Sequence, residues 1–274
     1  MTRWIASLPM YNVTPRHAAL WRSLLNDCVA LLARSFELGD VAVVNAPEGE
    51  LMSHWRGEDL LLSQSCGFPY RMLGLASEVH LVSTPIFDAA GCEGPRYRSV
   101  LVVSAEAWER GAKTLDACRG LRAACNSADS HSGMNALRHA VAPLARDGRF
   151  FGSVRWTGSH AATLRALASG DADVGAIDCV TFALLNDSQP EMFDSVRTIG
   201  MTASAPGLPL IASRTLGEDR VQALRDALDA ALAADPERAR TLRLRGFARL
   251  AGEAYAEIED MADAAAHWGY RELR

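Results

Sequence analysis

The segment LRAACNSADSHSG, residues 121–133, decides the fold prediction because it combines a short apolar run, a polar turn and the start of a helix. We expect a strand at 121–125 and a helix that begins at Gly133. In open α/β sheets such turns lie at the carboxyl ends of the strands, where ligands bind. The segment therefore predicts an α/β protein with a ligand site at this turn.

The same alternation of strand and helix continues outward in both directions. Thr14 and Pro15 mark the clearest helix start, because threonine favours the cap and proline the first helical position. The alternation predicts parallel sheets with crossover helices. Strands are expected at residues 4–8, 41–44, 60–63, 79–83, 99–104, 121–125, 151–156, 173–177, 196–201 and 210–213, and further helices from Ser159, through 221–232 and through 255–265.

The strand–helix pattern starts again after the loop that contains Gly91, Gly94 and Pro95. This restart predicts two Rossmann-like lobes joined by two crossings, at 84–99 and 202–209. We assign residues 1–85 and 204–274 to lobe 1 and residues 86–203 to lobe 2. A ligand cleft is expected between the lobes.

Charge and hydropathy exclude several classes of partner. The 274 residues carry 28 Lys+Arg and 33 Asp+Glu, so the net charge is 28 − 33 = −5 and there is no basic field for nucleic acid. Charges interrupt every long apolar window, so no membrane insertion is expected. The apolar run before Pro9 is too short for a signal peptide, which predicts a cytoplasmic protein for the sequence as it stands.

The six cysteines have no C-x-x-C or zinc-type spacing and are expected to be reduced and buried. Cys66 and Cys92 lie in glycine-flanked loops, so this pair is the one that could form a disulfide. The pair Asp171 and Asp173 has no third carboxylate at loop spacing, which favours a solvated turn over a metal site. We therefore predict neither a metal nor a cofactor.

The turn at 126–133 is the best candidate for binding an anion. The first turn of a helix has unpaired N–H groups and partial positive charge, so Ser130, Ser132 and the amides of Gly133 and Met134 could surround an oxyanion. A serine N-cap without a ligand is the alternative.

Two more polar turns follow predicted strands in the same lobe. Gly158, Ser159 and His160 form the first, and His160 could bind an anion more strongly below its ordinary pKa near 6.5. Asp178 forms the second because it directly follows the apolar strand 173–177. The alternative for Asp178 is a helix N-cap.

Lobe 1 offers a smaller set of candidates. Tyr11 follows the first strand, and Gln64 and Ser65 follow the third, again at carboxyl ends. Phe68 and Tyr70 could form an aromatic wall of the site, although aromatic residues there could equally belong to the core.

Known enzyme motifs are absent from the sequence, including G-x-S-x-G, the P-loop, G-x-G-x-x-G and H-E-x-x-H. His131 and His160 are the candidate acid–base residues, with Cys66 or Cys179 as a possible nucleophile. These isolated residues favour binding over catalysis.

Four segments resemble the phosphate/phosphite/phosphonate family of periplasmic substrate-binding proteins of ABC transporters. They are DLLLSQSCGFPY (59–70), NSADSHSGMNAL (126–137), TGSHAATLRAL (157–167) and GDADVGAIDCVT (170–181), followed by APGLPL (205–210) at the return crossing. The resemblance implies a type 2 periplasmic-binding-protein fold, a periplasmic location and an ABC permease partner.

The resemblance also implies roles for single residues. Ser130, His131 and Ser132 fall where the family grips the phosphonate oxygens, while His160 and Asp178 fall on a family histidine and a family acidic residue that meets the protonated or amino end of the ligand. The sequence departs from the family at Phe68, where tyrosine is common, and at His131, where threonine is usual.

These observations predict a non-catalytic solute-binding protein for a small oxyanion such as phosphate or a phosphonate. The alternative is an enzyme or sensor on the same fold, as in thiamine-pyrimidine biosynthesis. A nucleophile or metal group in the cleft would favour the enzyme. A third possibility, an interaction module, predicts no polar cleft.

Overall fold

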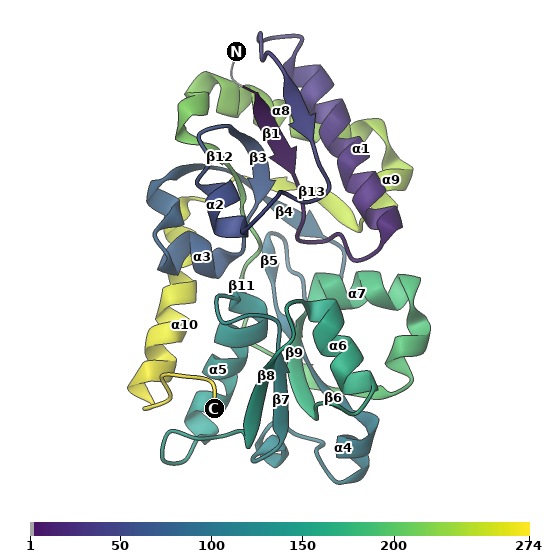
Figure 1. Ribbon diagram of the computed structural model, residues 1–274, viewed down its shortest axis with the longest axis vertical. Helices are drawn as coiled ribbons and strands as arrows, with labels where there is room; N and C mark the ends of the chain where they lie inside the picture. The colour runs from purple at the N-terminus through teal and green to yellow at the C-terminus, as the bar shows by residue number, and fades with distance from the viewer. Residues whose placement is uncertain (1–2) are drawn as a thin grey trace. The chain divides into compact units, whose positions relative to one another are not determined.

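A computed structural model describes residues 3–274, so the first two residues of the predicted lobe 1 lie outside it. The chain divides into two compact units. Unit 1 comprises Met1–Asp88 and Pro206–Tyr255, and unit 2 comprises Ala89–Ala205 and Ala256–Arg274. Each unit has its own sheet, with strand order β13-β4-β12-β3-β1-β2 in unit 1 and β10-β6-β9-β7-β8 in unit 2 (Figure 1).

The sheet of unit 1 is mixed, not parallel as predicted. β1 runs parallel to β2 and β3, but β12 is antiparallel to both β3 and β4. Leu210, the first residue of β12, pairs with Gln64, the last residue of β3. The chain therefore re-enters the sheet beside the carboxyl end of β3. The strands are β1 (Trp4–Ser7), β2 (Val41–Val43), β3 (Leu60–Gln64), β4 (Val79–Phe87), β12 (Leu210–Ser213) and β13 (Leu244–Ala248).

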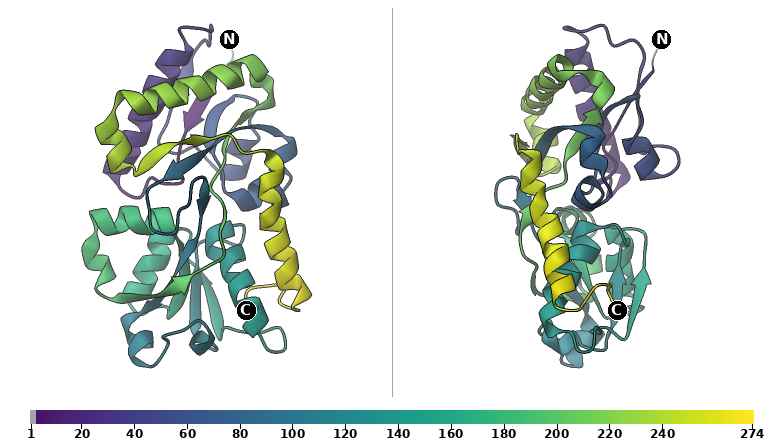
Figure 2. Two further views of the ribbon diagram at one scale, coloured as in Figure 1. Left: turned by 180° about the vertical axis from the view of Figure 1, so that it is seen from behind. Right: turned by 90° about the vertical axis from the view of Figure 1, so that its left-hand side faces the viewer.

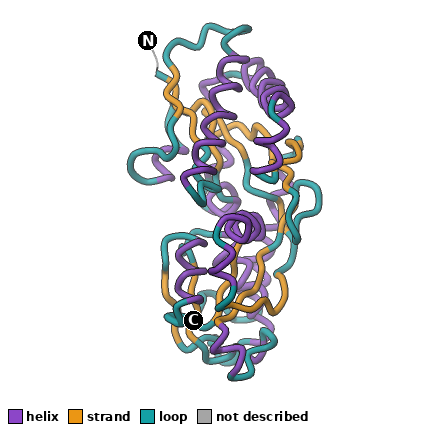
Figure 3. The backbone as a smooth tube through the Cα atoms, turned by 90° about the vertical axis from the view of Figure 1, so that its right-hand side faces the viewer, coloured by secondary structure: helices purple, strands orange, loops and turns teal. Residues whose placement is uncertain are grey.

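The first helix of unit 1 begins where the sequence predicts. Thr14 is the N-cap of α1 (Pro15–Leu32), and its side chain accepts a hydrogen bond from the His17 backbone N–H. The predicted apolar face, with Trp21 and Leu24, is buried, and α1 packs against α8 (Glu218–Ala234). The other helices of this unit are α2 (Leu51–Trp55), α3 (Gly67–Met72) and α9 (Pro236–Thr241). Figure 3 distinguishes the helices from the strands on the backbone by colour.

Unit 2 also has a mixed sheet. β7 is parallel to β8 and β9, whereas β6 is antiparallel to β9 and β10. Every residue of β6 and of β9 is buried, which is typical of strands covered on both faces. The strands are β6 (Ser99–Ser104), β7 (Arg122–Cys125), β8 (Ser153–Trp156), β9 (Val174–Asp178) and β10 (Val196–Met201), and the short β5 (Arg96–Tyr97) and β11 (Ala205–Pro206) pair separately.

The C-terminal helix belongs to unit 2, which corrects its predicted place in lobe 1 within 204–274. α10 (Ala256–His267) packs beside α5 (Ala136–Val141) (Figure 2). Asn135 Nδ2 donates to the carbonyl of Ile258 at 3.0 Å, and the side chain of Ile258 is fully buried. The apolar stripe of α10 predicts a buried face, but does not specify which sheet covers it. The other helices of unit 2 are α4 (Ala105–Glu109), α6 (His160–Ala168) and α7 (Cys179–Ser188).

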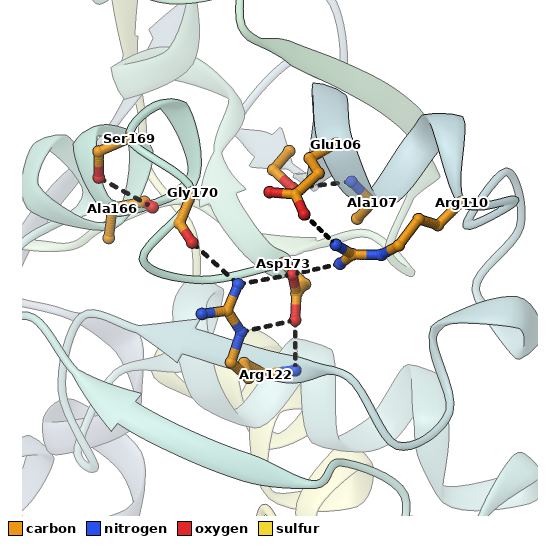
Figure 4. A network of polar contacts seen from close by, with 9 residues as sticks. Glu106, Ala107, Arg110, Arg122, Ala166, Ser169, Gly170 and Asp173 are labelled. Carbon is orange, nitrogen blue, oxygen red and sulfur yellow. Dashed lines mark hydrogen bonds and ion pairs between the residues drawn. The ribbon is translucent and has the colours of Figure 1, made fainter.

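The buried carboxylate of Asp173 is the centre of an ion-pair network with two half-exposed arginines, rather than part of the predicted solvated turn (Figure 4). Its carboxylate accepts from Arg122 Nε and Nη2 and from Arg110 Nη2, each at 2.9 Å. The Arg122 hydrogen bond is the main cause that lowers the Asp173 pKa. Asp171, in contrast, is exposed, as predicted.

The helices of residues 3–274 include none that combines the length and the apolar character needed to cross a bilayer.

Candidate functional site

The predicted anion-binding turn connects β7 to α5 in unit 2. It opens with a π-helical turn, His131–Asn135, in which the Asn135 N–H donates to the carbonyl of Ser130 at 3.0 Å. Ser130 is the N-cap, because its Oγ accepts from the Gly133 N–H at 3.1 Å. The capping interpretation of Ser130 is therefore correct, and the Gly133 N–H is already bonded. A capping oxygen uses its lone pair, so the Ser130 O–H can still donate.

Ser132 and His160 join this turn to the start of α6. Ser132 Oγ lies 2.8 Å from His160 Nε2. Ser132 is buried, and its backbone is fixed because Ser99 Oγ donates to the Ser132 carbonyl at 2.8 Å. The structure thus brings together two residues that the sequence predicted in separate turns.

Burial lowers the pKa of His160 to about 4. The pH-dependent anion affinity expected near pH 6.5 is therefore displaced to lower pH. At neutral pH the imidazole is neutral, with one nitrogen as donor and the other as acceptor. Ser132 Oγ can then give its own proton to a ligand only when His160 Nε2 carries the donor hydrogen.

Asn126 is a polar residue of this site that the predicted set omitted. A Cβ on Gly133 would lie 1.9 Å from Asn126 Oδ1 and 3.2 Å from His160 Cε1, so only glycine fits beside these side chains. Within residues 3–274, the buried Asn126 Oδ1 has no hydrogen-bond partner. Its position directly after β7 was the sequence signal, since polar side chains at strand ends collect around ligands.

The other predicted residues of unit 2 have structural partners. Ser159 Oγ caps α6 by accepting from the Ala162 N–H at 3.1 Å. Asp178 caps α7, since its Oδ1 accepts from the N–H groups of Val180 and Thr181 at 2.7 and 3.0 Å. The N-cap alternative for Asp178 is therefore correct, while its contact with a ligand stays a prediction.

His131 lies inside unit 2 and is 2% exposed. Its Nδ1 is 3.2 Å from Asn135 Nδ2, and its ring centroid is 6.1 Å from that of Tyr97. Burial lowers its pKa to about 4, so the imidazole is neutral at neutral pH. His131 therefore packs and positions the turn more than it presents a charge.

Unit 1 contains a second set of buried polar atoms. Gln64 and Ser65, both predicted from the sequence, are almost fully buried at the end of β3. Gln64 Nε2, Ser65 Oγ and the Oγ of Ser83 have no hydrogen-bond partner in the described part of the chain. Gln64 and Ser83 flank Leu210 from opposite sides in the sheet. Buried polar atoms are rarely unsatisfied, so this group indicates a site for a ligand or water.

The aromatic residues of unit 1 mainly form its core. The Tyr11 ring packs edge-on against Phe87 with centroids 5.0 Å apart, and Tyr70 packs in the same way against Tyr255. Burial raises the pKa of Tyr70. Phe68 is half-buried in α3. The core alternative therefore describes Tyr70 better than a wall of the site, and Tyr11 likewise packs in the core of unit 1.

The chemistry of the unit 2 turn favours binding. No group of three His, Cys, Asp or Glu side chains within 3–274 is placed to hold a metal ion. The contact between Ser132 Oγ and His160 Nε2 resembles a nucleophile with its base, but a general base works best with a pKa near the operating pH. A pKa of about 4 makes His160 a weak base, so hydroxyl and imidazole serve better as neutral hydrogen-bonding groups.

Comparison with protein families matches residues 57–255 to the family described as "ABC transporter, phosphonate, periplasmic substrate-binding protein". No curated protein sequence matches significantly.

Solved structures of other proteins are similar to this chain over nearly its whole length. PhnD1 from Prochlorococcus marinus, in complex with methylphosphonate, is 16% identical, with 96% of this chain and 97% of that chain covered and a TM-score of 0.74. A binding-protein component of an ABC phosphonate transporter from Pseudomonas aeruginosa is 15% identical, with coverage of 97% and 88% and a TM-score of 0.72. XAC2383 from Xanthomonas citri bound to ATP is 15% identical, with coverage of 98% for both chains and a TM-score of 0.70. These matches confirm the predicted type 2 periplasmic-binding-protein fold.

Proposed function

Because the chain belongs to the family of periplasmic substrate-binding proteins of ABC phosphonate transporters, we propose that the turn at 126–133 binds a small phosphorus oxyanion. The function of the family is solute binding without catalysis, as the sequence predicted. The ligand class proposed for this chain is a phosphonate or phosphate. An ABC permease is the proposed partner, and the periplasm of the family is the proposed location.

The contact between Ser132 and His160 carries this proposal. An oxyanion accepts hydrogen bonds and donates few, so it would accept the O–H of Ser132 while His160 Nε2–H donates to Ser132 Oγ. Ser130 adds a second O–H, and the start of the helical turn adds partial positive charge. The Asn126 amide provides both a donor and an acceptor, which suits a ligand that retains one proton.

In unit 1 we propose Gln64 and Ser65 as ligand contacts on the same reasoning. Gln64 Nε2 and Ser65 Oγ are buried and have no hydrogen-bond partner among residues 3–274. Binding would replace the penalty of these unsatisfied atoms with hydrogen bonds. The predicted cleft, and the predicted contacts of Tyr11, Phe68 and Tyr70, stay predictions.

Calorimetric titration of Ser132→Ala with methylphosphonate and with inorganic phosphate tests the proposal. Loss of one charge-assisted hydrogen bond of about 1.5–3 kcal/mol should weaken binding roughly tenfold or more. The matched control is Ser169→Ala, because Ser169 follows α6 at the end opposite to His160 and its Oγ bonds locally to the Ala166 carbonyl. Equal affinities in Ser132→Ala and wild type would refute the assignment, as would equal losses in both variants.

A further inference from the structure

Two cysteine thiols face each other in unit 2, outside the proposed anion site. Cys92 Sγ and Cys179 Sγ are 3.5 Å apart. Cys92 lies in the loop that follows β4, and Cys179 is the first residue of α7. The sequence instead suggested Cys66 as the possible partner of Cys92; Cys66 is buried in unit 1 at the start of α3.

The backbone on both sides holds the two thiols in place. The Cys92 N–H donates to the Ala89 carbonyl at 2.9 Å, and the Cys179 N–H donates to the Arg98 carbonyl at 3.1 Å. Gly91, at φ +102°, brings the loop directly onto Cys179, because a Cβ on Gly91 would lie 3.1 Å from Cys179 Cβ. This close approach requires glycine and sets the distance between the two side chains.

We infer that Cys92 and Cys179 form a reversible disulfide when the protein meets a low-molecular-weight disulfide such as oxidised glutathione. A disulfide has an S–S length of about 2.05 Å, so the two sulfur atoms must approach by roughly 1.5 Å. Cys92 is half-buried on a loop, where a rotation of its side chain can supply much of this movement.

The exposure of the two thiols sets the order of the reaction. Cys92 is the more accessible, whereas Cys179 is 1% exposed, so the Cys92 thiolate attacks the glutathione disulfide and releases one glutathione thiol. The Cys179 thiol then loses its proton and attacks Cys92 Sγ in the mixed disulfide, which releases the second glutathione. Two protein thiols are oxidised and one disulfide is reduced to two thiols, so electrons and protons balance. The hydrogen bond with Cys92 and burial raise the pKa of Cys179, so its thiolate is scarce in the reduced protein and Cys92 reacts first.

The disulfide would restrain the loop at 88–95 against the start of α7. The loop at 88–95 is where the chain passes from unit 1 to unit 2, and Cys179 directly follows the α7 cap Asp178. A disulfide from residue 92 to residue 179 closes a long loop and so removes much entropy from the unfolded chain. We expect oxidation to raise the melting temperature by about 5–10 °C.

Peptide mapping of the full wild-type chain tests the pairing directly. The reduced protein is incubated with oxidised glutathione, alkylated under denaturing conditions and digested with trypsin. Cys92, Cys179 and Cys66 fall in the separate tryptic peptides 72–96, 166–197 and 57–71. We expect 72–96 to be linked to 166–197, with the intact mass lower by two hydrogen atoms and restored by dithiothreitol. A link between 57–71 and 72–96, stable glutathione on Cys92 or six alkylated cysteines would overturn the inference.

Two variants separate this bond from general thiol oxidation. Cys92→Ser should remove both the link and the rise in melting temperature on oxidation. Cys118→Ser is the matched control, because Cys118 is a buried cysteine of the same unit whose thiol donates to the Thr114 carbonyl. This control should retain both effects. A rise in melting temperature that persists in Cys92→Ser would show that another reaction stabilises the protein.

Discussion

The contact between Gly133 and Asn126 provides the sharpest test of the anion site. In Gly133→Ala the new Cβ would lie 1.9 Å from Asn126 Oδ1 and 2.8 Å from Asn126 Cγ. Carbon and oxygen atoms in contact normally lie more than about 3 Å apart, so one of these groups must move by about 1 Å or more. The Asn126 side chain is the softer of the two, because it can rotate while the helix start is held by its own hydrogen bonds.

This collision should reduce ligand affinity more than stability. Alanine is favoured over glycine in a helix by about 0.5–1 kcal/mol, which offsets part of an overpacking cost of about 1–3 kcal/mol. The net change in unfolding free energy should therefore be about 0–2 kcal/mol. Displacement of Asn126 and of the nearby His160 ring removes at least one ligand hydrogen bond, so affinity should fall roughly tenfold or more.

A double-mutant cycle separates the collision from other effects of alanine. Methylphosphonate affinity and melting temperature are measured for wild type, Gly133→Ala, Asn126→Ala and the double variant. Removal of the Asn126 amide makes room for the new Cβ, so we expect Gly133→Ala to cost less in the Asn126→Ala background than in wild type. Additive losses of affinity, or full affinity in Gly133→Ala, would refute the reasoning.

Two further predictions concern titratable groups in unit 2. Asp173→Asn should lower the unfolding free energy by about 2 kcal/mol, because the charge-assisted hydrogen bonds to Arg122 and Arg110 are lost. The pKa of Asp173 is lowered in the folded state, so this stability is present at neutral pH and is lost as the pH falls through the lowered pKa. Urea unfolding between pH 7 and pH 3 measures this stability. Asp171→Asn is the matched control, because Asp171 is exposed, and should change the unfolding free energy little. Equal effects of the two variants would contradict the network. For His160, with a folded pKa of about 4, anion affinity should stay constant between pH 8 and pH 5.5 apart from titration of the ligand itself. A rise in affinity centred near pH 6.5 that His160→Asn abolishes would show that the pKa of the histidine is not lowered.

Much of the local structure follows from the sequence alone. Thr14, Ser130 and Ser159 begin helices or helical turns because each hydroxyl caps the backbone N–H three residues further along the chain. The strands predicted at 99–104 and 196–201 form with those same bounds. Such preferences depend on neighbouring residues, so no knowledge of the rest of the chain is needed.

The candidate site was only partly predictable. The sequence indicated the hydroxyl-rich turn and His160 as candidates, because polar residues after buried strands collect where ligands bind. The 2.8 Å contact of Ser132 with His160, and the fit of Asn126 against Gly133, depend on how two turns pack beside each other. Local patterns also leave both roles of Asp178 open, and the structure shows the cap.

Other features were decided by the tertiary structure. The antiparallel direction of β12 depends on where the chain re-enters the sheet, and the place of α10 depends on which apolar surface was left to cover. Asp173 is buried because Arg110 and Arg122 reach it from distant positions, and Cys179 faces Cys92 across 87 positions of sequence. The physical reason is that hydrophobic burial is not directional. An apolar pattern in the sequence therefore predicts that a surface is buried, while the packing of the whole chain decides which element covers it.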